Sequence, residues 1–76
     1  MIKLKVYENG TKEWYLNGKL HREDGPAIKD HYDNKYWYLN GKIHREDGPA
    51  AENKNGHKEW WINGRFQKSN YHSRKP

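Results

Sequence analysis

Residues 14–27 read WYLNGKLHREDGPA, and residues 37–50 read WYLNGKIHREDGPA. The two copies are identical at 13 of 14 positions and begin 23 residues apart. A third copy, WWINGRF, starts on the same spacing at residues 60–66 and then departs from the motif. Terminal units of repeat proteins are commonly atypical because they cap the stack. The spacing therefore predicts a repeat protein of about two and a half 23-residue units.

Each unit carries the signals of two strands and two turns. Outside the repeated motif, a turn signal recurs at equivalent positions: Asn9-Gly10, Tyr32-Asp33 and Asn55-Gly56. Asn-Gly predicts a type I′ hairpin turn because both residues tolerate a positive φ. One strand is predicted at residues 11–16 and a second at 26–31, after a longer connection over 17–25. Since no segment has a helical period, we expect an all-β fold, an antiparallel meander sheet of five to seven strands.

The composition is that of a small, polar and aromatic-rich chain. Of its 76 residues, 32% are hydrophobic and 14% aromatic, and the high aromatic content argues against disorder. The absence of cysteine excludes disulfides and zinc sites built on thiolates. No apolar run approaches the roughly 20 residues of a membrane-spanning helix, and the polar start is unlike a signal peptide. We therefore expect a protein of a reducing, cytoplasmic compartment.

The net charge of +5 is concentrated towards the C-terminus. Residues 1–59 hold 11 Lys and Arg against 10 Asp and Glu, whereas residues 60–76 hold four basic side chains and no acidic one. The four are Arg65, Lys68, Arg74 and Lys75. This division predicts a β-repeat domain at residues 1–66 and a basic C-terminal tail at residues 67–76.

The repeated motif, Trp-Tyr-x-Asn-Gly-x-x-His-Arg-Glu-Asp-Gly-Pro-Ala, resembles MORN repeats over residues 5–66. More closely, it resembles a MORN-like variant of small uncharacterised proteins from large tailed bacteriophages. It departs from ordinary MORN repeats at His21-Arg22 and His44-Arg45, where a His-Gly pair is expected. The resemblance implies a small phage-type protein that binds a bacterial host protein in the host cytoplasm and modulates or inhibits it. Eukaryotic MORN proteins are linked to phospholipid and protein binding.

The His-Arg-Glu-Asp tetrads at 21–24 and 44–47 carry the residue types of acid/base and metal chemistry. A catalytic site needs one asymmetric constellation of side chains, and a metal site needs several converging ligands. The same tetrad occurring twice is instead typical of a structural loop, in which the Arg pairs with a carboxylate and the Asp accepts backbone N–H bonds. The residues predicted to be structural in the two loops are Arg22, Asp24, Gly25, Arg45, Asp47 and Gly48.

Aromatic pairs recur at the end of the first predicted strand of each unit. Because side chains alternate along a strand, the two rings of a pair face opposite sides of the sheet. Trp14, Trp37 and Trp60 are invariant among the copies and are predicted to form the core. Tyr15, Tyr38 and Trp61 then lie on the other face, where regularly spaced aromatic residues suit a binding surface. The alternative is a two-sided core covered by lysine stems.

These observations favour a non-enzymatic protein-binding module without catalytic, cofactor-binding or metal-binding residues. The predicted partner-binding residues are Tyr15, Tyr38, Trp61, Arg65, Lys68, Arg74 and Lys75. The alternative is nucleic-acid or anionic-surface binding through the basic C-terminal segment and the exposed aromatic residues. A meander has two unpaired edges, so a homodimer through a sheet edge is a further arrangement to consider.

Overall fold

The computed structural model describes residues 1–70, which form ten β-strands and no helix. The strands are β1 (Ile2–Val6), β2 (Lys12–Leu16), β3 (Lys19–Leu20), β4 (Ile28–Lys29), β5 (Lys35–Tyr36), β6 (Tyr38–Leu39), β7 (Lys42–Ile43), β8 (Ala51–Glu52), β9 (Lys58–Ile62) and β10 (Arg65–Ser69). The predicted all-β fold is confirmed.

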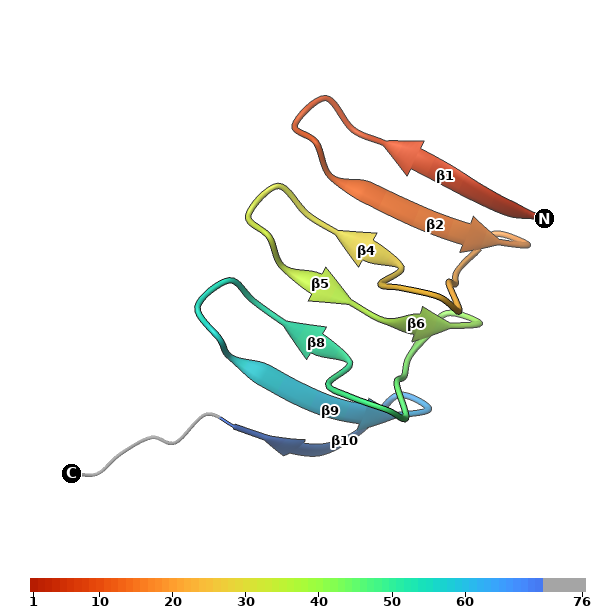
Figure 1. The fold of residues 1–76 in the computed structure, drawn as a ribbon. Helices are drawn as coiled ribbons and strands as arrows, with labels where there is room; N and C mark the ends of the chain where they lie inside the picture. Colours follow the sequence, from red (N-terminus) through yellow and green to blue (C-terminus); the bar gives the residue numbers. More distant parts are fainter. Residues whose placement is uncertain (71–76) are drawn as a thin grey trace.

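The sheet is an antiparallel meander that follows the order of the chain (Figure 1). The path β1-β2-β4-β5-β8-β9-β10 has seven strands, the upper end of the predicted range. Two two-residue strands, β3 and β7, lie in the predicted connections and were not predicted. β3 pairs with β2, and β7 pairs with β6, which is equivalent to the end of the strand predicted at residues 11–16. The strands lie side by side in a single layer, and the shortest dimension of the molecule is 16 Å. Both faces of the sheet are therefore open to contact.

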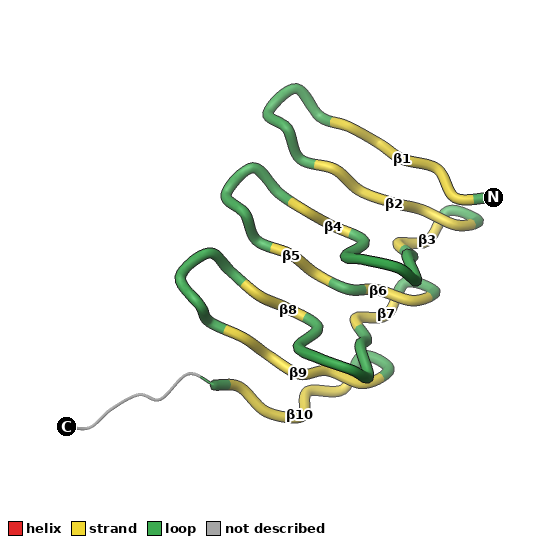
Figure 2. The backbone as a smooth tube through the Cα atoms, viewed as in Figure 1, coloured by secondary structure: helices red, strands yellow, loops and turns green. Residues whose placement is uncertain are grey.

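A loop leaves the sheet opposite Trp14, and another opposite Trp37. The Trp14 N–H donates to the Ala27 carbonyl (2.8 Å), and the Trp14 carbonyl accepts from the His21 N–H (2.9 Å). Residues 22–26 lie between these two bonds and form a protruding loop (Figure 2). The connection predicted over residues 17–25 thus consists of a tight turn, the short strand β3 and this loop.

The type I′ turns lie inside the repeated motif. At Asn17-Gly18 both residues have a positive φ (52° and 80°), and the equivalent pairs of the next two units repeat this. At Asn9-Gly10 only Gly10 does (φ 94°), and Tyr7 bonds to both Gly10 and Thr11, which is the geometry of a type I turn with a bulge. The prediction of type I′ turns at Asn9-Gly10 and Asn55-Gly56 is therefore wrong.

The core is smaller than the sequence predicts. The buried residues are Ala27 and Ala50 (both 0% exposed), Ala51, His21 and His44. Trp14, Trp37 and Trp60 are only partly buried, so the prediction that they form the core is wrong. A single layer has no second sheet to cover a large ring, and only small side chains flanked by the loops are fully enclosed.

The last strand extends beyond the predicted domain boundary at residue 66. β10 continues to Ser69 and pairs with β9 on both sides of Gln67, and the Asn70 N–H then donates to the Lys58 carbonyl (3.1 Å). Residues 67–69 are thus part of the sheet rather than of the predicted basic tail. Arg74 and Lys75 lie outside the described residues.

Candidate functional site

The sheet register brings the three predicted contact rings onto one face, called here the aromatic face. Tyr15 is directly opposite Leu20, Tyr38 opposite Ile43, and Trp61 opposite Phe66. Directly opposite residues of an antiparallel pair project to the same side, so each ring has an apolar neighbour. Backbone bonds such as Gly41 N–H to the Leu20 carbonyl (2.8 Å) join successive units. The result is one apolar row across all three units.

A carboxylate holds the ring at the N-terminal end of this row. The hydroxyls of Tyr15 (2.6 Å) and Tyr7 (2.9 Å) both donate to Glu13 Oε1. The hydrogen bond to Glu13 is the main reason that the pKa of Tyr15 rises to about 12, with burial and the negative charge of Glu13 adding to it. Tyr15 therefore presents its ring with its polar tip already satisfied.

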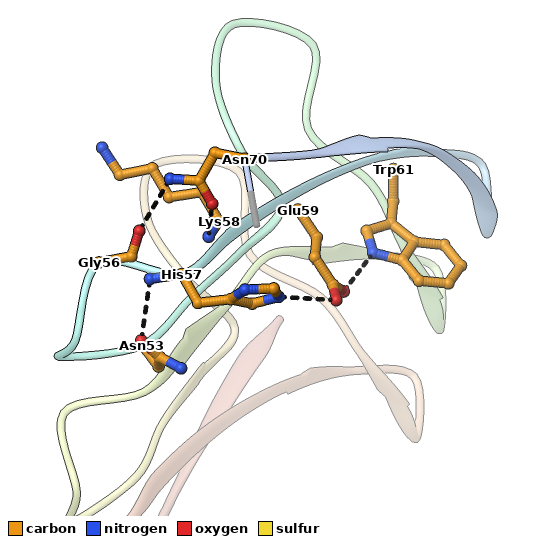
Figure 3. A network of polar contacts seen from close by, with 7 residues as sticks. All are labelled: Asn53, Gly56, His57, Lys58, Glu59, Trp61 and Asn70. Carbon is orange, nitrogen blue, oxygen red and sulfur yellow. Dashed lines mark hydrogen bonds and ion pairs between the residues drawn. The ribbon is translucent and has the colours of Figure 1, made fainter. Parts of the chain in front are cut away.

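The C-terminal end repeats this arrangement with different residues (Figure 3). Glu59 Oε1 accepts from the Trp61 indole N–H (3.0 Å), and Glu59 Oε2 lies 3.0 Å from His57 Nε2. The hydrogen bonds from His57 and Trp61 hold the pKa of Glu59 below its ordinary value, although burial opposes them. Glu59 is thus ionised and fixes Trp61, just as Glu13 fixes Tyr15.

The middle unit has a tyrosine where the outer units have these carboxylates. Tyr36 lies 23 residues from both Glu13 and Glu59, and its neighbours across the strands are Ile28 and Ala51. Burial raises the pKa of Tyr36, and the nearby negative charge of Asp30 adds to the shift. The aromatic face is consequently most apolar at its centre and carries a carboxylate towards each end.

The opposite face, called here the Trp face, carries the three repeated tryptophans, each beneath a cation. The guanidinium carbon of Arg22 lies 3.9 Å from the Trp14 ring centroid, and that of Arg45 lies 4.0 Å from Trp37. Arg22 Nε donates to Asp24 (3.1 Å), and Arg22 Nη1 donates to the Pro26 carbonyl (3.3 Å). Asp24 thus accepts its bond from Arg22 rather than from the backbone amides expected from the sequence. The Arg, Asp and Gly of both loops serve the loop itself.

Two buried histidines join one unit to the next, a role that was not predicted from the sequence. His21 Nδ1 accepts from the Asn40 N–H, and His44 Nδ1 accepts from the Asn63 N–H (both 2.9 Å). Each ring therefore carries its proton on Nε2, which faces a glutamate two residues on. One signal for this role exists in the sequence. The motif retains the histidine only in the first two units, each of which is followed by a further copy of the Asn-Gly turn.

The basic residues of β10 do not join the aromatic row. Arg65 is opposite Ile62, and Lys68 is opposite Trp60, so both project from the Trp face. The ammonium of Lys68 lies 4.9 Å from the Trp60 ring centroid, the position that an arginine takes in the first two units. Of the predicted contact residues within 1–70, Tyr15, Tyr38 and Trp61 therefore share the aromatic face, whereas Arg65 and Lys68 share the Trp face.

Residues 1–70 hold no group of three or more His, Cys, Asp and Glu side chains arranged to bind a metal ion. The described part of the chain also contains no helix able to span a membrane. No protein-family model matches the sequence, and the searches of curated proteins and of solved structures found no match either.

Proposed function

We propose that this protein is a non-enzymatic protein-binding module and that the aromatic face is its contact surface. The observation that carries the proposal is the continuous row of Tyr15, Tyr38 and Trp61, whose rings stay partly exposed on one face of a single-layer sheet. Tyr and Trp are the residues most enriched at the energetic centres of protein interfaces.

The geometry of the row also suits a protein contact. The polar tips of Tyr15 and Trp61 are bonded to carboxylates of their own strands, so these rings are positioned before any partner arrives. Pre-positioned rings lose little conformational entropy on binding. Phe66 is 52% exposed and packs edge-on against Trp61, with 5.3 Å between the two ring centroids. It extends the apolar surface towards the last strand. A partner with an apolar surface of similar width fits this row.

The resemblance to MORN-like phage proteins supports a narrower form of the proposal. In that form the partner is a bacterial host protein of the cytoplasm, and binding modulates or inhibits its activity. The aromatic face acts by covering a surface of the partner, since the tetrads are already engaged: their Arg and Asp within the loop, and their His in the bond to the next unit.

Pairing of two copies through a sheet edge is a less favourable arrangement. Lys3 and Lys5 of the outer strand β1 project on the aromatic face, because they lie opposite Tyr15 and Glu13. Two β1 strands side by side place four lysines on one face, and like charges across a strand pair are destabilising. Edge lysines are a common protection against such pairing.

The alternative of nucleic-acid binding by the C-terminal segment together with the exposed tyrosines is not supported by this arrangement. Arg65 and Lys68 project from the face opposite to Tyr15 and Tyr38. A strand that stacks on the tyrosines therefore does not meet these two charges.

The experiment is an affinity capture from bacterial lysate with four immobilised forms of the protein, quantified by mass spectrometry. The forms are the unmodified chain, Tyr38→Ala, Trp61→Ala and the control Tyr32→Ala. Tyr32 is 60% exposed at a turn and lies outside the row. We expect a specific protein to be captured by the unmodified and control forms and reduced about tenfold or more with Tyr38→Ala and Trp61→Ala. Equal capture by all four forms contradicts the proposal.

A further inference from the structure

The Trp face carries three lysines in direct cross-strand register, called here the lysine ladder. Lys12 of β2 is opposite Lys29 of β4, and Lys29 is opposite Lys35 of β5. Neighbouring strands lie about 4.7–4.9 Å apart, and like charges directly opposite one another destabilise an antiparallel pair. Nothing in the sheet requires lysine at these positions, so the ladder opposes folding and needs another explanation.

The charge of the ladder is not neutralised within residues 1–70. None of the three ammonium groups has a carboxylate within 4 Å in this part of the chain. The next residue across the sheet, Glu52, lies opposite Lys35 but is 3.6 Å from Arg45 Nη1. Lys35 is also only partly exposed, which removes some of the water that otherwise screens its charge.

The ladder lines a hollow in the Trp face. This hollow has a volume of about 480 Å³ and is bounded by the ladder and by the two arginines that lie over the tryptophan rings, Arg22 and Arg45. Five cationic side chains thus face one space, and Glu52 is its single carboxylate. Both arginines are fixed by their rings and loop carbonyls and are paired with Asp24 and Asp47. Within residues 1–70, the unpaired positive charge of the hollow therefore comes from the three lysines.

We propose that this hollow binds the phosphodiester backbone of a nucleic acid without regard to base sequence. Lysine is depleted at protein–protein interfaces, whereas Lys and Arg side chains neutralise the phosphates of a nucleic acid. Arg22 and Arg45 cover the tryptophan rings and prevent bases from stacking on them, so base recognition is not provided. The hollow lies on the face opposite to the aromatic face, and the inference does not depend on the protein-binding function.

The test is fluorescence anisotropy with labelled oligonucleotides of mixed sequence, in single-stranded and duplex form, over a range of salt concentrations. The triple variant Lys12→Gln, Lys29→Gln, Lys35→Gln removes the ladder. The matched control, Lys3→Gln, Lys5→Gln, Lys54→Gln, has the same net charge and leaves the hollow intact. We expect the ladder variant to lose about tenfold or more in affinity for at least one form. For the single strand, the slope of log affinity against log salt concentration is expected to become less steep by about two. Each phosphate contact contributes about 0.7 to this slope, and the variant removes three lysines.

A single variant separates this role from a structural one. Lys29→Glu places an opposite charge between Lys12 and Lys35, so it is expected to raise the melting temperature and to weaken oligonucleotide binding. If the ladder had only a structural role, Lys29→Glu would change the melting temperature and leave oligonucleotide binding unaltered. The proposal is overturned if the ladder variant binds as the unmodified protein does, or if the control loses as much affinity. It is also overturned if poly-glutamate binds more tightly than the oligonucleotides, because the partner is then an acidic protein.

Discussion

The repeated motif places an arginine between a tryptophan ring and a glycine. A Cβ atom added to Gly25 lies 3.0 Å from Arg22 Cζ, and one added to Gly48 lies 2.9 Å from Arg45 Cζ. The distance at Gly48 is shorter than real Cβ atoms show, and the distance at Gly25 is tighter than in nine of ten real Cβ contacts, so the guanidinium would have to shift in both loops. These two glycines do not have a positive φ, so they accommodate this close approach rather than a turn. The Trp, the Arg and the Gly therefore form one packing unit, although Gly25 lies 11 positions after Trp14 in the sequence.

Titration of Tyr15 gives a test at this scale. Its pKa of about 12, against an ordinary 10.0, means that folding favours the protonated hydroxyl bonded to Glu13. The stabilisation is complete below pH 10 and is lost as the pH rises through about 12. Ultraviolet absorbance is followed against pH for the unmodified protein and for Tyr15→Phe. The difference between the two curves reports the ionisation of the Tyr15 hydroxyl. We expect Glu13→Gln to move the midpoint back towards 10.0, whereas an unchanged midpoint contradicts the role of Glu13.

The C-terminal strand replaces the missing loop of the third unit. The register of β10 shifts between Phe66 and Lys68, so Gln67 is an extra residue and Lys68 comes to lie opposite Trp60. Without this bulge Gln67 would face Trp60, and Lys68 would point to the aromatic face. The bulge therefore supplies the last tryptophan with a cation from a strand instead of from a loop.

Substitution of Lys68 tests this replacement. Lys68→Ala removes the cation 4.9 Å from the Trp60 ring and is expected to lower the free energy of unfolding by about 0.5–1 kcal/mol. Lys68→Arg restores the residue type found over Trp14 and Trp37, so it is expected to retain or raise the stability. Urea denaturation measures the free energy of unfolding of both variants. Arg65→Ala, on the same strand and exposed, is the control and is expected to change stability by less than about 0.5 kcal/mol.

The elements were predictable where the sequence repeats, and the contacts between them were not. The 23-residue period located the strands and the aromatic row, since alternation alone assigns Tyr15, Tyr38 and Trp61 to one face. It did not show that the sheet has one layer, and for that reason the tryptophans were predicted to be buried. The position of Lys68 depends on a bulge that has no sequence signature. The bond from His21 to the Asn40 amide spans 19 residues and follows only from the stacking of units.

At the scale of the whole molecule, the two buried histidines couple the stability of each unit to that of the next. A linear array of units depends on nearest-neighbour contacts, so a defect at one junction acts on the adjoining units. Backbone bonds such as Gly64 N–H to the Ile43 carbonyl (2.8 Å) accompany the bond from Asn63 to His44 at the second junction. This arrangement predicts local rather than uniform effects of histidine substitution.

Replacing His44 with alanine removes the acceptor of the Asn63 N–H, and a typical intramolecular hydrogen bond contributes about 0.5–1.5 kcal/mol to stability. Amide hydrogen exchange measured by NMR is expected to become faster over β9 and β10 than over β1 and β2. For His21→Ala, the faster exchange is expected nearer the junction between the first and second units, where His21 bonds to Asn40. His31→Ala, an exposed position in a turn, is the control and leaves exchange unchanged. Equal acceleration at both ends of the sheet for His44→Ala contradicts unit-by-unit coupling.

The identical junctions have a consequence for how such a protein changes over generations. Because His21 and His44 make the same bond to the following turn, duplication of one 23-residue segment adds a length of sheet without requiring a new interface. The number of aromatic residues in the row then grows in whole steps at constant spacing. Gain or loss of one segment therefore changes the length of the aromatic face while each remaining unit keeps the same residues.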